Sequence, residues 1–191
     1  LIVMSLIMTA AAIVVYVYLP DNHSTQPEQS KSPRIVLDLR LRYLMSIGII
    51  IFTAFALVQS ITAFYIQDRF GLDLDSTAQT TALLLGTMAL AAIVSQLTVV
   101  QRYKGSALNL IKFSVPLFVL SVILIIFSPN FNLFYLGMAL MGLGMGLASP
   151  GYTASASLNA DDQSQGAAVG LAMVAPGIGF AVCLLYTSDA A

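Results

Sequence analysis

Charged side chains are scarce in this sequence. Asp, Glu, Lys and Arg together make up 9% of the 191 residues, whereas 58% of the side chains are hydrophobic. An ordinary soluble domain carries about 25% charged residues, which cover the face that it turns to water. This composition excludes such a domain and predicts an all-α integral membrane protein, because a helix satisfies its backbone hydrogen bonds inside a bilayer.

Reactive groups are scarce as well. No Asp, Glu, Lys, Arg or His lies well inside an apolar run, the single histidine, His23, lies in a polar stretch, and there is one cysteine. A membrane enzyme needs a nucleophile, a metal cluster or an acid–base pair at depth, so we expect no enzyme, no metal and no bound cofactor. Intramembrane ionisable groups mark ion and proton pathways. Any coupling residue is therefore expected in helices outside this chain.

Long apolar runs dominate what is present. We predict six membrane spans, at about residues 1–19, 43–66, 77–100, 108–127, 131–154 and from 166 onward. Each is about long enough to cross a hydrocarbon layer of ~30 Å at 1.5 Å per residue. Residues 20–42 read as a polar linker, and residues 43–182 as a bundle of five spans. Asp75 or Ser76 is the expected N-cap of the third span.

The basic residues predict the orientation. If the linker 20–42 is cytoplasmic, seven of the eight Lys and Arg residues lie on the inner side, and only Arg69 lies outside. In the opposite orientation only one of the eight, Arg69, would lie on the inner side, as the positive-inside rule requires.

Both ends of the sequence suggest a fragment. The chain begins inside an apolar run without a methionine, and residues 183–191 resemble the translation of a sequencing transposon adapter. We expect these nine residues to be read-through, in which case Cys183 is not native and says nothing about redox compartment.

Small residues recur in the last two spans. Gly142 and Gly146 are four residues apart, as are Gly166 and Gly170. In a bilayer such pairs let a neighbouring helix approach closely. We expect these four glycines, with Pro176 and Gly177, to serve in helix packing and bending.

Short motifs flank the second predicted span, YLPD at 18–21 before it and QDRFG at 67–71 after it. The first resembles the exit of the sixth helix in the major facilitator superfamily, and the second resembles the turn after the seventh helix in its drug:proton antiporters. The loop at 101–105 (QRYKG) looks like a degenerate copy of the Asp-Arg-x-Gly signature that keeps Arg102. Gly166, Gly170, Pro176 and Gly177 are similar to an antiporter glycine–proline pattern, although Ala175 departs from it.

The resemblance implies a two-halved helical bundle that transports by alternating access. This chain would cover the last helix of the first half and most of the second, so the remaining helices of the same protein are expected partners. We expect no flux from this chain alone.

The second and fifth spans would then line a substrate cavity. The candidates share one face on each helix: Phe52, Phe55, Gln59 and Thr62 on the second span, and Met138, Met141 and Met145 on the fifth. Gln59 either contacts substrate or makes an interhelical hydrogen bond, and the methionines either adapt to ligands or pack against neighbours.

The expected function is proton-coupled efflux of drugs or amphiphilic molecules across a bacterial inner membrane, driven by the proton gradient. A sugar or organic-acid symporter or uniporter is the alternative, followed by a membrane sensor or assembly subunit. The expected partners are the lipid bilayer and a small-molecule substrate, and no nucleic acid.

Overall fold

The computed structural model describes residues 39–159 and 165–189, all of them helical or in short connections. The helices are α2 (Leu39–Phe70), α3 (Leu74–Thr98), the 3₁₀ turn η1 (Val100–Arg102), α4 (Ala107–Ile126), α5 (Phe131–Leu158), α6 (Gln165–Ala172) and α7 (Val174–Asp189). The predicted span at 1–19 and most of the linker lie outside the described residues.

Five of the predicted spans appear as helices that are long and apolar enough to cross a membrane, within the part of the chain that the structure describes. Four of them are α2, α3, α4 and α5, and the fifth runs from Gln165 to Cys183 across α6 and α7. The predicted all-α membrane fold is therefore confirmed.

Some boundaries differ from the prediction. The N-cap of α3 is Asp73, not Asp75 or Ser76, because the turn is made by Gly71 with a φ of +61° and the helix begins three residues later, at Leu74. The fifth span continues four residues further, to Leu158, where the Asn159 side chain donates to the Ser155 carbonyl at 2.7 Å. The last span is broken at Met173.

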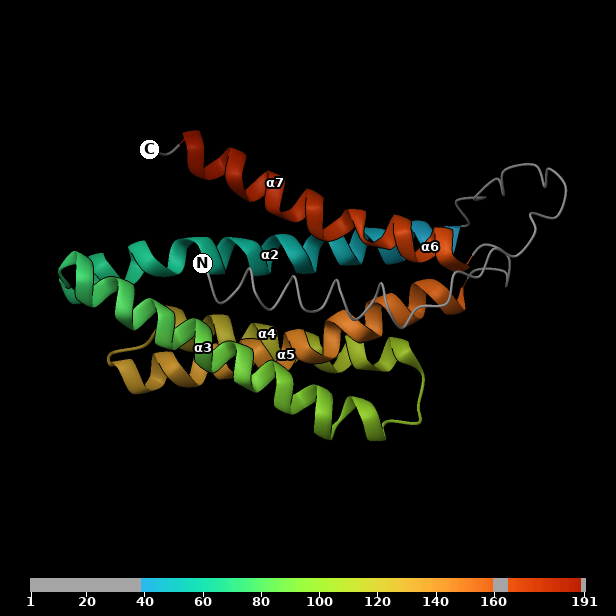
Figure 1. The fold of residues 1–191 in the computed structure, drawn as a ribbon, viewed down its shortest axis with the longest axis horizontal. Coiled ribbons are helices and arrows are strands. Elements are labelled where there is room, and N and C mark those ends of the chain that lie inside the picture. Colours follow the sequence, from blue (N-terminus) through green and yellow to red (C-terminus); the bar gives the residue numbers. More distant parts are fainter. Residues whose placement is uncertain (1–38, 160–164, 190–191) are drawn as a thin grey trace, which may run out of the picture. The chain divides into compact units, whose positions relative to one another are not determined.

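Helix α5 lies at the centre of the packing. Half of its most apolar window (50%) is buried, against 17% to 28% for the other four spans. It packs against both α3 and α4, which lie beside it in Figure 1. Glycines make these contacts close, because a Cβ at Gly142 would overlap the Met88 carbonyl on α3, and one at Gly151 would lie 3.0 Å from the Ala107 carbonyl on α4.

Helix α2 is covered mainly by α7 (Figure 1). A Cβ at Gly179 would lie 2.8 Å from the backbone nitrogen of Thr53, so the two backbones nearly touch. Further along, the Cys183 thiol lies 3.2 Å from the Ser60 hydroxyl. The glycine thus allows α7 to seat directly on α2.

The two ends of the bundle are identified by contacts between helix termini. At one end, the start of α2 meets the start of α4 and the end of α5, where Tyr43, Leu108 and Asn159 line a shared depression. At the other end, the ring of Phe70 stacks on that of Phe131 with centroids 4.0 Å apart. Helices α2 and α4 therefore run in the same direction, antiparallel to α5.

Candidate functional site

The predicted cavity face of α2 is divided between two hydrophobic clusters. Phe52 is 6% exposed and meets the ring of Tyr152 edge-on, at a centroid distance of 5.6 Å. Phe55, one turn along, packs instead against the cluster around Phe134. The Thr62 hydroxyl is buried and donates to the Val58 carbonyl of its own helix at 2.6 Å.

Gln59 differs from its neighbours on this face. Its side chain is half-buried, and no residue in the described part of the chain accepts or donates a hydrogen bond to its amide. Gln59 therefore keeps its hydrogen-bonding capacity for a group that these helices do not supply.

The methionines of α5 fall into two groups. Met138 is fully buried and Met141 is 1% exposed, and both belong to the cluster that joins α2, α3, α4 and α5. Met145 is half-buried and packs against the cluster of Phe52 and Tyr152. Of the three, Met145 has the most side-chain surface available for contact with a ligand.

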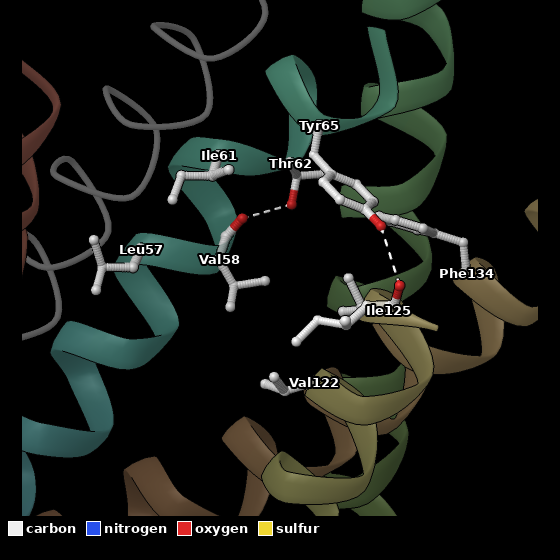
Figure 2. A pocket seen from close by; sticks show the side chains of 9 residues that line it. Leu57, Val58, Ile61, Thr62, Tyr65, Val122, Ile125 and Phe134 are labelled. Atoms are coloured by element: carbon white, nitrogen blue, oxygen red, sulfur yellow. Dashed lines mark hydrogen bonds between the residues drawn. The ribbon is translucent and has the colours of Figure 1, made fainter. Parts of the chain in front are cut away.

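Two apolar grooves run between α2 and α4, with α5 at their base. The larger has a volume of about 190 Å³ and is shown in Figure 2; its lining includes Val58, Thr62, Tyr65, Ile125 and Phe134. Its two hydroxyl groups are already in use, because Thr62 donates to Val58 and Tyr65 donates to the Ile126 carbonyl at 3.3 Å. The groove offers a solute no unused side-chain donor, and only the two hydroxyl oxygens can still accept a hydrogen bond.

The second groove is smaller, about 110 Å³, and is lined by apolar side chains that include Phe55, Val122 and Met141. Ligand pockets commonly measure about 300–1,000 Å³, so neither groove holds a drug-sized molecule by itself. Their chemistry suits an alkyl chain or an apolar helix face. The α4 residues in both linings were not singled out from the sequence, where nothing marks them apart from other lipid-facing residues.

A family comparison bears on what these helices belong to. The model of the Major Facilitator Superfamily matches residues 1–183 of the 191. The chain belongs to the major facilitator superfamily. No curated protein and no solved structure matches the chain significantly.

Membership in this superfamily makes the chain part of a secondary transporter, not an enzyme. Among the described residues, no group of three His, Cys, Asp or Glu side chains is placed to hold a metal ion.

The glycines predicted to pack or bend helices have different surroundings. Gly142 and Gly146 lie against α3, where added Cβ atoms would overlap the Met88 carbonyl and the Ser95 hydroxyl. By contrast, no described atom lies within 4 Å of a Cβ built on any of three others: Gly166, Gly170 and Gly177. Pro176 is half-buried in the first turn of α7.

The loop between α3 and α4 carries the motif residue Arg102. This residue ends the 3₁₀ turn η1, and its side chain is exposed. Arg102 therefore lies at the same end of the bundle as the starts of α2 and α4, well away from the grooves between those helices.

Proposed function

We propose that this chain is part of a proton-coupled exporter of amphiphilic small molecules, and that α2 and α5 contribute one wall of its substrate cavity. The observation that carries the proposal is the amide of Gln59, which has no hydrogen-bond partner among the described residues, on a face of α2 whose other polar group, the Thr62 hydroxyl, donates to its own helix. The wall is formed by Gln59 together with the partly accessible side chains of Phe55 and Met145.

The energetics of Gln59 support a wet or ligand-filled space beside it. An amide without a hydrogen-bond partner costs about 1–3 kcal/mol in a protein interior and several in hydrocarbon. That cost is removed if water, substrate or another helix of the same protein reaches the amide. A water-accessible cavity supplies the first two.

The ratio of apolar to polar side chains in this wall supports an amphiphilic substrate. One amide among aromatic, thioether and alkyl groups binds a molecule by apolar contact and fixes its orientation with a single polar group. Methionine adapts its shape to different ligands, which suits an exporter of several compounds. A sugar site would need more hydrogen-bonding groups than this wall provides.

We also propose that the end of the bundle that holds the starts of α2 and α4 faces the cytoplasm of a bacterial cell, across the inner membrane. Four basic residues belong to this end: Arg42, Arg102, Lys104 and Lys112. Arg69 lies in the last turn of α2, at the opposite end. The positive-inside rule supports this orientation.

The test is ethidium transport into inside-out proteoliposomes that contain the complete protein and carry an imposed pH gradient. We expect Gln59→Leu to reduce the initial rate roughly tenfold, as the loss of one hydrogen bond of about 1.4 kcal/mol would do. Gln96→Leu is the matched control, because Gln96 is an exposed amide on α3. Equal rates for the two variants would contradict the role of Gln59, and an absence of gradient-driven uptake would contradict efflux of such cations.

A further inference from the structure

The last span is interrupted at one place, and a proline explains the interruption. Helix α6 ends at Ala172, Met173 forms a turn whose N–H donates to the Val169 carbonyl at 3.0 Å, and α7 begins at Val174. In a continuous helix the N–H of residue 176 would bond the carbonyl of residue 172. Pro176 has no N–H, so this carbonyl loses its partner within the helix.

A side chain from another helix takes that place. The Tyr152 hydroxyl on α5 donates to the Ala172 carbonyl at a distance of 3.2 Å. Tyr152 is 3% exposed, so water contributes little to either group. The acceptor is thus the same carbonyl that Pro176 leaves open.

The ring of Tyr152 is held from the α2 side. Phe52 meets it edge-on with an interplanar angle of 74°, and Gly48 provides the space, since a Cβ there would lie 2.5 Å from the ring. One tyrosine therefore connects three elements: it belongs to α5, packs against α2 and bonds the end of α6.

We propose that Tyr152 is a positioning residue for transport, which sets the angle between α6 and α7 by completing the hydrogen bond that Pro176 cannot make. Proline-broken membrane helices retain such carbonyls only where a neighbour satisfies them. The hydroxyl can rotate away when α5 and α6 shift relative to each other, so the bend is held in one arrangement and released in another. This inference holds for any substrate of the transporter.

The test measures the bend directly. Spin labels at Gly166 on α6 and Val182 on α7, both exposed, are separated by sixteen residues, or about 24 Å in a straight helix. The distance between them is measured by pulsed electron paramagnetic resonance in lipid nanodiscs, in the full chain with Cys183→Ser. Tyr152→Phe removes the hydroxyl that bonds the Ala172 carbonyl and leaves the ring in place. The bend is then held less firmly, so the distance distribution should broaden.

A double variant distinguishes this mechanism from general loosening. Pro176→Ala restores the N–H, so the helix bonds the Ala172 carbonyl itself and the distance should lengthen and sharpen. Adding Tyr152→Phe to Pro176→Ala should then change nothing further. An unchanged distribution in Tyr152→Phe alone, or equal broadening in both backgrounds, would overturn the proposal.

Two controls match the substitutions. Tyr135 lies on the same helix, and the described residues provide no hydrogen-bond partner for its hydroxyl, so Tyr135→Phe should leave the distribution unchanged. Pro116→Ala makes the same chemical change inside α4, away from the bend, and should also leave it unchanged. An effect of either control as large as that of Tyr152→Phe would argue against a specific bond.

Transport supplies the functional measurement. In the complete protein, Tyr152→Phe should lower the maximal rate of ethidium uptake several-fold and leave its KM within about twofold, since Tyr152 positions a helix and does not touch the solute. A shift in KM alone would overturn the positioning role. If ethidium is not carried, the proposed efflux function fails while the distance measurements still decide the inference.

Discussion

The close contact between α3 and α5 at Gly142 makes a quantitative prediction about Gly142→Ala. A Cβ at this position overlaps the backbone carbonyl of Met88 and lies 3.0 Å from the Cβ of Ala91. A backbone atom cannot move aside like the end of a flexible side chain, so α3 and α5 must separate along their whole contact. Overpacking of this kind costs about 1–3 kcal/mol.

Gly144→Ala is the matched control on the same helix. The nearest atoms to its Cβ lie at 3.4 Å and beyond, which is ordinary van der Waals contact. Because alanine is the better helix former by about 1 kcal/mol, this variant should be as stable as the parent or slightly more stable. The two variants make the same chemical change on the same helix and differ in steric overlap, so a difference in their stability reports the cost of that overlap.

The assay uses the chain's single cysteine as its reporter. Cys183 is buried, so a thiol-reactive fluorophore labels it only as the protein unfolds. At about 2–4 °C per kcal/mol for a chain of this size, Gly142→Ala should lower the Tm by roughly 2–12 °C, and Gly144→Ala should not lower it. Equal Tm values for the two variants would refute the argument that backbone overlap at Met88 determines the contact.

Three further predictions concern the turn after α2 and the orientation of the chain. Gly71→Ala should cost about 1–2 kcal/mol, because its φ of +61° is left-handed while no atom lies within 4 Å of the new Cβ; thermal unfolding measures this. The Ser76 side chain and backbone N–H hold the pKa of Asp73 below its ordinary value. This stabilisation is present above the ordinary pKa of Asp and is lost as the pH falls through the lowered pKa of Asp73. Acidification below about pH 4 should therefore lower the Tm of the parent more than that of Asp73→Asn. Parallel plots of Tm against pH for the two proteins would contradict this. Cysteines at Arg69 and Lys104 should be labelled from opposite sides of the membrane, and labelling from one side would exclude the proposed topology.

The helices of the described part could be predicted because a bilayer leaves the backbone few alternatives. Apolar run length alone located α2 to α5 to within a few residues at each end, and it found the last span. The end positions depended on local geometry that composition does not encode. The start of α3, for example, follows from the left-handed Gly71 and not from the strength of Asp75 or Ser76 as a capping residue.

Helix faces were harder to predict than helices. Phe52 and Thr62 share a face of α2, yet ten residues separate them by about 15 Å along the axis, and they meet different neighbours. The spacing of glycines was equally uninformative about helix partners. Gly142 and Gly146 pack against α3, whereas a Cβ built on the equally spaced Gly166 or Gly170 has no described atom of another element within 4 Å. Spacing along one helix does not reveal which partner faces it.

The bend in the last span was foreseeable in part. Pro176 predicts an open carbonyl four residues earlier by a general rule. Its acceptor role toward Tyr152 was not foreseeable, because the donor lies twenty residues away on another helix. Such a pairing depends on tertiary arrangement.

The seating of α7 on α2 has a consequence for biogenesis. Helices α3, α4 and α5 follow one another in the chain, and α5 contacts both α3 and α4, so the three can associate as soon as α5 has left the ribosome. The main partner of α2 is synthesised more than a hundred residues later, because the backbone of Thr53 on α2 packs against Gly179 on α7. During that interval the face of α2 that Gly179 covers in the folded chain is exposed to lipid or to a membrane chaperone.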